Sequence, residues 1–202
     1  MNSEPGLRDR KKQRTRSALN RSALVLAAER GLDHVTVEDI STAAGVSPRT
    51  FFNYFTSKEE AVVGPDPETG PRIRRRVLEQ PAHLGAAEAL KAAMLAELAE
   101  ELAEDREFWL LRMKVVQQHP VLLARLFAGG EEAERQVVAG IAERVGLPPD
   151  DLYPMLLAAA ASAAGRVAFA QWAEPDGLRP LEALFGDAMD LLSAGLANPP
   201  GA

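Results

Sequence analysis

The chain has 202 residues and a formal net charge of −6 at pH 7, and this length suits one compact body with a small appended domain. It contains no cysteine, which excludes a disulfide framework and thiol catalysis. Because no apolar run approaches the roughly 18 residues of a membrane span and the N-terminus lacks an apolar signal segment, the sequence predicts a cytoplasmic protein.

The first segment of the chain is basic. Residues 1–58 hold 10 Lys and Arg against 6 Asp and Glu, a net of +4, whereas residues 59–202 hold 13 against 23, a net of −10. The basic residues nearest the N-terminus are Arg8, Arg10, Lys11, Lys12, Arg14, Arg16 and Arg21. A solvated tail is the ordinary explanation of such a run. The alternative is an arm that lies along the phosphates of a nucleic acid.

An amphipathic helix is predicted over residues 15–30. Leu19, Ala23 and Leu26 recur at helical spacing, and Gly31 can end a helix in the left-handed conformation. A second helix is predicted over about 37–44. Its N-cap is Thr36, and Asp39 three residues later makes an approximate capping box, because Asp is shorter than the usual Glu or Gln.

A third and a fourth helix start follow after a turn at Gly45. Ser47, with proline at the first helical position, predicts a helix over about 48–54. Ser57, with Glu60 three residues on, predicts another capping box. Two short helices joined by a tight turn have the outline of a DNA-reading helix-turn-helix.

The helices of this segment are expected to share one small core. Its predicted members are Leu19, Ala23, Leu26, Val35, Ile40, Ala44, Val46, Phe51 and Phe55.

This stretch resembles the N-terminal domain of the TetR family of bacterial transcription regulators. The family pattern is an Arg-rich helix, Gly, Thr-Val-x-x-Ile-Ala-x-x-Ala-Gly-Val-Ser, Thr-Leu-Tyr-x-x-Phe and Ser-Lys-Glu-Glu. This chain has Thr-Val-Glu-Asp-Ile-Ser-Thr-Ala-Ala-Gly-Val-Ser, Thr-Phe-Phe-Asn-Tyr-Phe and Ser-Lys-Glu-Glu, over roughly a quarter of its length. It departs at Phe51 and Phe52, where the family usually has Leu-Tyr, so a phenolic hydroxyl that often reaches a phosphate is absent.

The motif and the resemblance together predict the DNA contacts. Arg49 is expected to read a guanine edge in the major groove, with Thr50 and Asn53 contributing nearby. Capping residues beside exposed backbone N–H groups are expected to hold phosphates. The predicted set is Arg14, Thr36, Ser47, Pro48, Arg49, Thr50, Asn53, Tyr54 and Lys58.

The chain changes character over residues 64–71, which are dense in helix breakers. We therefore predict a DNA-binding domain over 1–63 and a larger helical domain over 64–202. Further helices are predicted over 72–80, 86–104, 108–118, 121–145 (weakened at its central glycines), from Asp150 or Asp151 to about 172, and 180–196. No segment alternates with period two, so the predicted fold class is all-α.

The last two helices are expected to join two copies of the chain. Residues 155–170 are rich in alanine, which allows close helix approach, and the last helix places Leu184 and Phe185 on an apolar stripe. An intramolecular core is the commoner explanation of one stripe. Helix-turn-helix proteins bind two half-sites with two copies, and the resemblance implies a four-helix dimer bundle. We therefore expect a homodimer on a palindromic DNA operator.

The helices between the DNA-binding domain and the last two helices are expected to enclose an apolar ligand. Aromatic and methionine side chains gather there and suit an adaptable apolar site, although an ordinary core is the alternative. Arg112 and Arg166 lie among apolar neighbours, where a guanidinium needs an acidic partner or a ligand. The predicted lining is Met94, Leu98, Phe108, Trp109, Arg112, Met113, Phe127, Arg166 and Phe169.

A narrower resemblance suggests the kind of ligand. Thr-Phe-Phe-Asn-Tyr-Phe-x-Ser-Lys-Glu-Glu-x-Val-Val, with Trp-Ala-Glu-Pro-Asp and Leu-Arg-Pro-Leu near the end, resembles the mycofactocin-regulator branch of the family. This implies acyl-CoA-type ligands, whose binding would release the operator. Four arginines could form a basic entrance to the ligand site, namely Arg72, Arg74, Arg75 and Arg76. A solvated basic face is an equally good explanation of them. A ligand-independent regulator is the alternative.

An enzyme is the alternative from a different class. His34, His83 and His119 lie in separate segments without metal-ligand spacing, and the chain has neither a Gly-rich phosphate loop nor a Gly-x-Ser-x-Gly elbow. We therefore predict no catalytic residue, no metal site and no cofactor.

Overall fold

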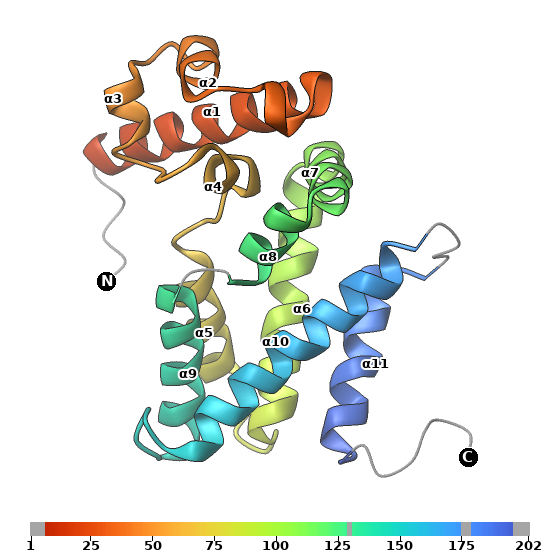
Figure 1. Cartoon of the computed structure of the whole chain (residues 1–202). Coiled ribbons are helices and arrows are strands. Elements are labelled where there is room, and N and C mark those ends of the chain that lie inside the picture. The colour runs from red at the N-terminus through yellow and green to blue at the C-terminus, as the bar shows by residue number, and fades with distance from the viewer. Residues whose placement is uncertain (1–6, 129–130, 175–178, 196–202) are drawn as a thin grey trace. The chain divides into compact units, whose positions relative to one another are not determined.

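The computed structural model describes residues 7–128, 131–174 and 179–195, without the side chains of residues 7–10, 127, 128 and 131. Every regular element in these ranges is helical, and the predicted all-α class is confirmed. The helices are α1 (Leu7–Arg30), the short η1 (Leu32–His34), α2 (Val37–Ala43), α3 (Pro48–Phe51), α4 (Lys58–Val63), α5 (Thr69–Glu79), α6 (Ala86–Glu104), α7 (Arg106–Gln118), α8 (Pro120–Ala128), α9 (Glu131–Val145), α10 (Leu152–Trp172) and α11 (Leu181–Ser193) (Figure 1).

Several of the predicted helices have different bounds in the structure. α1 is longer, because the basic segment continues the helix up to Leu7. α3 is shorter: residues 52–54 form turns, in which the Tyr54 N–H donates to the carbonyl of Phe51 at 2.9 Å. The helix predicted over 121–145 is two helices, α8 and α9, and Gly129 and Gly130 lie outside the described residues.

The chain forms two compact units. Unit 1 comprises residues 1–65 and 107–128, and unit 2 comprises residues 66–106 and 129–202. The helices α7 and α8 therefore belong with the N-terminal helices, although they follow the boundary predicted from the sequence. The functional domains predicted over 1–63 and 64–202 stay a prediction.

The core of unit 1 lies where α1 packs on α2 and α4, and where α4 packs on α8. Seven residues of the predicted core are buried, namely Leu19, Ala23, Leu26, Val35, Ile40, Phe51 and Phe55. Ala44 and Val46 are only half-buried because they flank the turn between α2 and α3. The apolar side of α4, Ala61 to Val63, completes this core.

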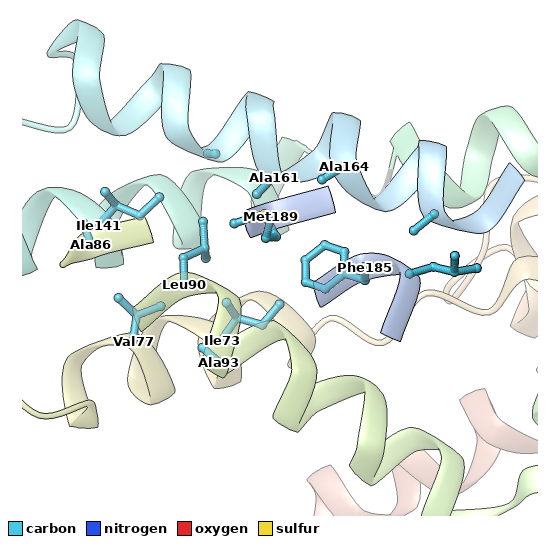
Figure 2. Close-up of a cluster of buried hydrophobic side chains, with 13 residues drawn as sticks. Ile73, Val77, Ala86, Leu90, Ala93, Ile141, Ala161, Ala164, Phe185 and Met189 are labelled. Atoms are coloured by element: carbon cyan, nitrogen blue, oxygen red, sulfur yellow. The ribbon is translucent and has the colours of Figure 1, made fainter. Parts of the chain in front are cut away.

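The core of unit 2 joins α5, α6, α9, α10 and α11 (Figure 2). α10 contributes only alanines to the buried cluster, Ala158, Ala161, Ala164 and Ala168, which lets the larger side chains of α9 and α11 pack close to its backbone. α5 and α9 approach still more closely. A Cβ at Gly70 would lie 2.7 Å from the Cα of Ala133, so this crossing requires glycine.

The apolar stripe of α11 belongs to this intramolecular core. Leu184 and Phe185 are 7% and 6% exposed within one chain and pack in the cluster of unit 2 (Figure 2). The expectation that they form the surface of contact between two copies is therefore wrong. Their burial is explained by the small side chains of α10, against which α11 packs.

Candidate nucleic-acid interface

The helix α2 begins with the capping box that the sequence predicts. The Oγ1 of Thr36 accepts a hydrogen bond from the Asp39 N–H at 3.1 Å, and the Asp39 carboxylate accepts from the Thr36 N–H at 3.0 Å. The Thr36 hydroxyl also donates a hydrogen bond to this carboxylate. The hydrogen bonds from the hydroxyl and from the backbone N–H together lower the pKa of Asp39 below its usual value. The shorter acid thus closes the box, and α2 has a fixed first turn.

The turn and the start of α3 also follow the prediction. Gly45 adopts φ +68°, a conformation that favours glycine, and the next N–H, that of Val46, donates to the carbonyl of Ser41 at 2.9 Å. The Oγ of Ser47 then accepts a hydrogen bond from the Thr50 N–H at 3.1 Å, with Pro48 in the first turn. The segment is therefore a helix-turn-helix with both helix starts held by side chains.

The short α3 buries one side and exposes the other. Phe51 is fully buried, whereas Arg49, Phe52 and Asn53 are exposed. Thr50 is half-buried, and its hydroxyl lies 2.9 Å from the hydroxyl of Ser47. The exposed residues form a surface that a nucleic acid can reach, and Arg49 carries its five N–H donors there.

Arg16 holds the segment that follows α3, a role that the sequence did not reveal. Its Nη1 donates to the carbonyl of Tyr54 at 2.9 Å and its Nη2 to the carbonyl of Pro65 at 2.7 Å. The guanidinium also lies 4.4 Å from the ring centroid of Phe55. Arg16 therefore acts within unit 1, whereas Arg14 is exposed on α1 as a phosphate contact requires.

The helix α4 begins at the predicted cap but with a different partner for Glu60. The Oγ of Ser57 accepts from the Glu60 N–H at 3.2 Å, while the Glu60 carboxylate accepts from the N–H of Thr56 at 2.7 Å. Lys58 donates to the carbonyls of Leu32 and Val35 at 2.8 and 2.9 Å. Two of its three N–H groups are thus engaged, and its predicted phosphate contact stays a prediction.

The end of α4 is fixed by a buried amide. Asn20, 8% exposed, donates from its Nδ2 to the carbonyl of Ala61 at 2.7 Å. Gly64 follows with φ +63°, and a Cβ there would lie 2.0 Å from the Asn20 Nδ2. Both the backbone conformation and the space available therefore require glycine at this position.

Two parts of the chain match known families. Residues 20–62 match the bacterial regulatory proteins of the tetR family, and residues 84–197 match the MftR C-terminal domain. The chain belongs to the TetR family. This confirms the resemblance seen in the sequence and makes the protein a transcriptional regulator with a DNA-binding helix-turn-helix, not an enzyme.

Full-length relatives support the same assignment. The HTH-type transcriptional regulator TcmR of Streptomyces glaucescens is 36% identical over 197 residues, which cover 93% of this chain and 87% of that protein. The putative mycofactocin biosynthesis transcriptional regulator MftR of Mycobacterium tuberculosis is 28% identical over 194 residues, with 93% of each chain covered. The crystal structure of the Thermus thermophilus repressor FadR in complex with lauroyl-CoA has the same fold, with a TM-score of 0.54, 22% identity and coverage of 93% of this chain and 98% of FadR.

The residues that we predicted to line a ligand site in this TetR-family protein fall in both units. In unit 1, Trp109 and Met113 are buried. Arg112 lies with its guanidinium 5.2 Å from the Phe108 ring centroid, and Arg21 lies 4.4 Å from the same centroid. The Nη2 of Arg112 also lies 3.4 Å from the Oδ1 of Asn20, so this arginine packs against α1. The side chain of Phe127 lies outside the described residues.

The remaining predicted lining residues lie in unit 2. Met94 packs against the core cluster, Leu98 is half-buried, and Phe169 is buried with its ring centroid 5.7 Å from that of Trp172. Arg166, in contrast, is exposed. Arg166 lies on the side of α10 opposite to the buried alanines. Its exposure does not support the prediction that Arg166 anchors a ligand inside one chain.

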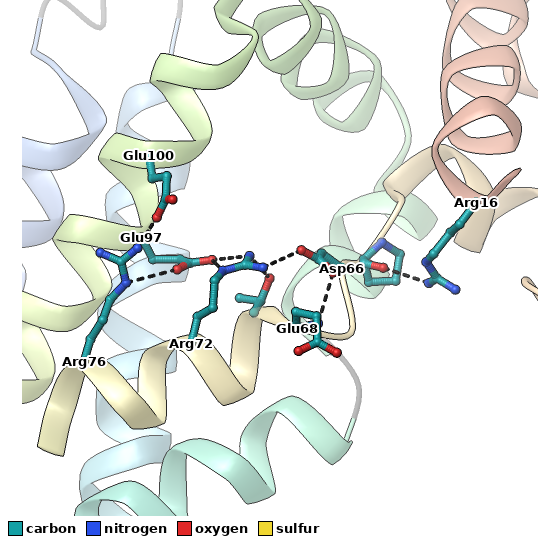
Figure 3. Close-up of polar contacts among 9 residues, drawn as sticks. Arg16, Asp66, Glu68, Arg72, Arg76, Glu97 and Glu100 are labelled. Carbon is teal, nitrogen blue, oxygen red and sulfur yellow. Dashed lines mark hydrogen bonds and ion pairs between the residues drawn. The ribbon is translucent and has the colours of Figure 1, made fainter. Parts of the chain in front are cut away.

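The four arginines of α5 do not form a basic entrance or a solvated basic face. Arg72 pairs with Asp66 at 2.7 Å and Arg74 with Glu143 at 2.9 Å. The carboxylate of Glu97, on α6 and 5% exposed, lies between Arg72 and Arg76, and hydrogen bonding to Glu97 raises the pKa of Arg72 (Figure 3). Arg75 and Arg76 also meet Glu79 and Glu100. These pairs neutralise the positive charge, so their role is to join α5 to α6 and α9.

One face of α10 is apolar and exposed. Leu152, Met155, Leu156 and Val167 are 77%, 52%, 61% and 57% exposed and lie on one side of the helix. The expectation that no apolar segment approaches the length of a membrane span is wrong, because α10 is long and apolar enough by length and composition. In a TetR-family regulator, this exposed face is a candidate contact surface for a second chain.

Proposed function

We propose that the protein is a repressor that binds a palindromic operator as a homodimer and is released by an apolar ligand. Recognition of DNA is supported chiefly by the exposed surface at α3. Arg49 and Asn53 are exposed there, whereas Phe51 is buried. Both helices of the motif have capped starts, so these side chains are presented from a rigid element.

Arg49 is the residue proposed to specify a base. A guanidinium matches the O6 and N7 acceptors of guanine in the major groove, and Arg49 lies in the first turn of α3, the end of a recognition helix that points to base edges. Thr36 and Ser47 are exposed caps beside backbone N–H groups and are proposed to hold phosphates. Arg14 and the other exposed cations of α1 would add sequence-independent affinity.

Two copies are proposed to meet through α10 and α11. The exposed face of α10, with Leu152, Met155, Leu156 and Val167, supports this because a soluble monomer rarely leaves such a row uncovered. An isologous dimer presents two α3 helices related by a twofold axis, which matches a palindrome with half-sites about one helical turn apart. A protein that meets DNA in this way would act in the cytoplasm.

The proposed ligand is an acyl-CoA or a fatty acid. The lauroyl-CoA bound to a protein of the same fold supports this class, as does the resemblance of the sequence to the mycofactocin-regulator branch. Within unit 2, the proposed contacts include Met94, which packs against the core cluster, and the buried Phe169. Because α4 leads directly from the recognition segment to the rest of the chain, a ligand that shifts α4 would change the spacing of the two α3 helices.

Titration of full-length protein tests both parts of the proposal. Long-chain acyl-CoAs and free fatty acids are added with and without DNA from upstream of the protein's own gene. If ligand releases the operator, operator must weaken ligand binding by the same factor, about five-fold or more. Equal ligand affinity in the two titrations would contradict release. DNA binding with no acyl-CoA binding would favour a ligand-independent regulator.

A further inference from the structure

The exposed aromatic ring of the recognition segment is Phe52. Its neighbours Phe51 and Phe55 are 0% and 1% exposed and form the core of unit 1, whereas Phe52 is 59% exposed. Burial of a phenylalanine ring is more favourable than burial of a single methyl group. A partner that covers the exposed ring of Phe52 would therefore gain free energy of binding.

The ring of Phe52 has a fixed support. It meets Phe51 edge to face, with ring centroids 5.3 Å apart and planes at 84°. Phe52 itself is the C-cap of α3 in a helical conformation, with φ −66° and ψ −10°. One side of the ring therefore rests on the core, and the rest projects outward from a rigid backbone.

Phe52 shares its surface with the residue proposed to read a base. Arg49 lies three residues earlier, and residues at this spacing are neighbours on a helix. If α3 lies in the major groove with Arg49 on a guanine, the adjacent base pair is within reach of a side chain at the position of Phe52. A phosphate is a poor partner for this ring because phenylalanine carries no hydrogen-bond donor.

The major groove offers only one apolar group to such a ring, the C5 methyl of thymine. We propose that Phe52 is a specificity-determining residue that contacts a thymine methyl group next to the base read by Arg49. This inference rests on the proposed mode of operator recognition by α3 and deepens it. It assigns to the protein a preference for thymine that no polar residue of the motif would supply.

The first step of the test identifies the sites that the protein binds. Full-length protein selects duplexes from a random pool, and thymines in the selected half-site are then replaced one at a time by deoxyuridine. This replacement removes the methyl group and leaves base pairing unchanged. Loss of one buried methyl group corresponds to about 0.8 kcal/mol, so we expect affinity to fall about four-fold per half-site at one position.

The second step assigns that loss to Phe52. The Phe52→Ala variant should bind thymine and deoxyuridine duplexes equally, whereas Phe52→Tyr and Arg49→Ala should keep the difference. Circular dichroism of Phe52→Ala should match the parent, because the ring is mostly exposed. As a folding contrast, Phe51→Ala should lose thermal stability.

The possible outcomes distinguish the proposed contact of Phe52 with thymine from the proposed recognition of an operator by α3. Selection that enriches no sequence would overturn the proposed operator recognition and the inference with it. An enriched site at which deoxyuridine binds as tightly as thymine would overturn the inference alone. A methyl effect that persists unchanged in Phe52→Ala would assign the thymine to another residue and would also overturn it.

Discussion

Arg16 on α1 donates a hydrogen bond of 2.9 Å to the backbone carbonyl of Tyr54, three residues beyond the end of α3. The same guanidinium donates to the carbonyl of Pro65 at 2.7 Å. One side chain from the basic N-terminal helix therefore fixes both ends of the segment that includes α4. In this protein a cation that seemed available to phosphates is part of the support for the recognition segment.

The first prediction concerns this support. Arg16→Gln should lower the free energy of unfolding by about 1–2 kcal/mol, because two hydrogen bonds from a charged group are lost at a half-buried site. Arg14→Gln is the matched control: it is exposed on the same helix and should leave urea unfolding unchanged while it weakens DNA binding. Equal stability of the two variants would show that the Arg16 contacts do not hold the segment.

The second prediction concerns the capping box of α2. The pKa of Asp39 is lowered in the folded protein, chiefly by hydrogen bonds from Thr36, so its ionised form stabilises the fold. This contribution is present above the ordinary Asp pKa of about 3.9 and is lost as the pH falls through the lower value of the folded protein. Asp39→Asn should therefore melt at a lower temperature than the parent at pH 7, and the difference should shrink at pH 3. A difference that is independent of pH would contradict this role.

The third prediction separates two roles of Lys58. Its ammonium donates to two carbonyls near η1, so Lys58→Met should lower the free energy of unfolding by about 1–2 kcal/mol. If Lys58 also contacts a phosphate, the slope of log affinity against log salt should become less steep by about 0.9. An unchanged slope with lower stability would restrict Lys58 to the structural role.

The fourth prediction concerns the dimer. Leu156→Glu places a charge on the exposed face of α10 and should convert the dimer to a monomer, because an unpaired charge in an apolar interface costs several kcal/mol. Leu78→Glu is the matched control, since Leu78 is a partly exposed leucine (37%) on a different helix, α5. Light scattering gives the mass of both variants. A dimer that survives Leu156→Glu would place the interface elsewhere.

The sequence predicted the helix-turn-helix in detail because its signals are local. Thr36, Ser47 and Ser57 each cap a helix through their own side chains, and glycine fits the turn for reasons of backbone conformation alone. The family pattern also lies within this short stretch. Such features need no knowledge of the rest of the fold.

Contacts between distant segments could not be predicted in the same way. Arg16 and Tyr54 are 38 residues apart, and Arg72 and Glu97 are 25 residues apart, so only the folded chain shows that these cations have partners. The stripe of α11 was assigned to the wrong surface for a related reason. A helical pattern identifies an apolar face but does not say whether the same chain or a second chain covers it.

Whether Arg49 reads a base in a specific operator is tested by a comparison of DNA affinities at one salt concentration. Parent and Arg49→Ala are titrated with DNA from upstream of the gene and with a scrambled duplex of equal length. We expect the parent to prefer the upstream DNA by about a thousand-fold or more. Arg49→Ala should lose about 1–3 kcal/mol of binding free energy on that DNA and little on the scrambled duplex. Equal affinity of the parent for both duplexes, or an Arg49→Ala variant as selective as the parent, would contradict base recognition by Arg49.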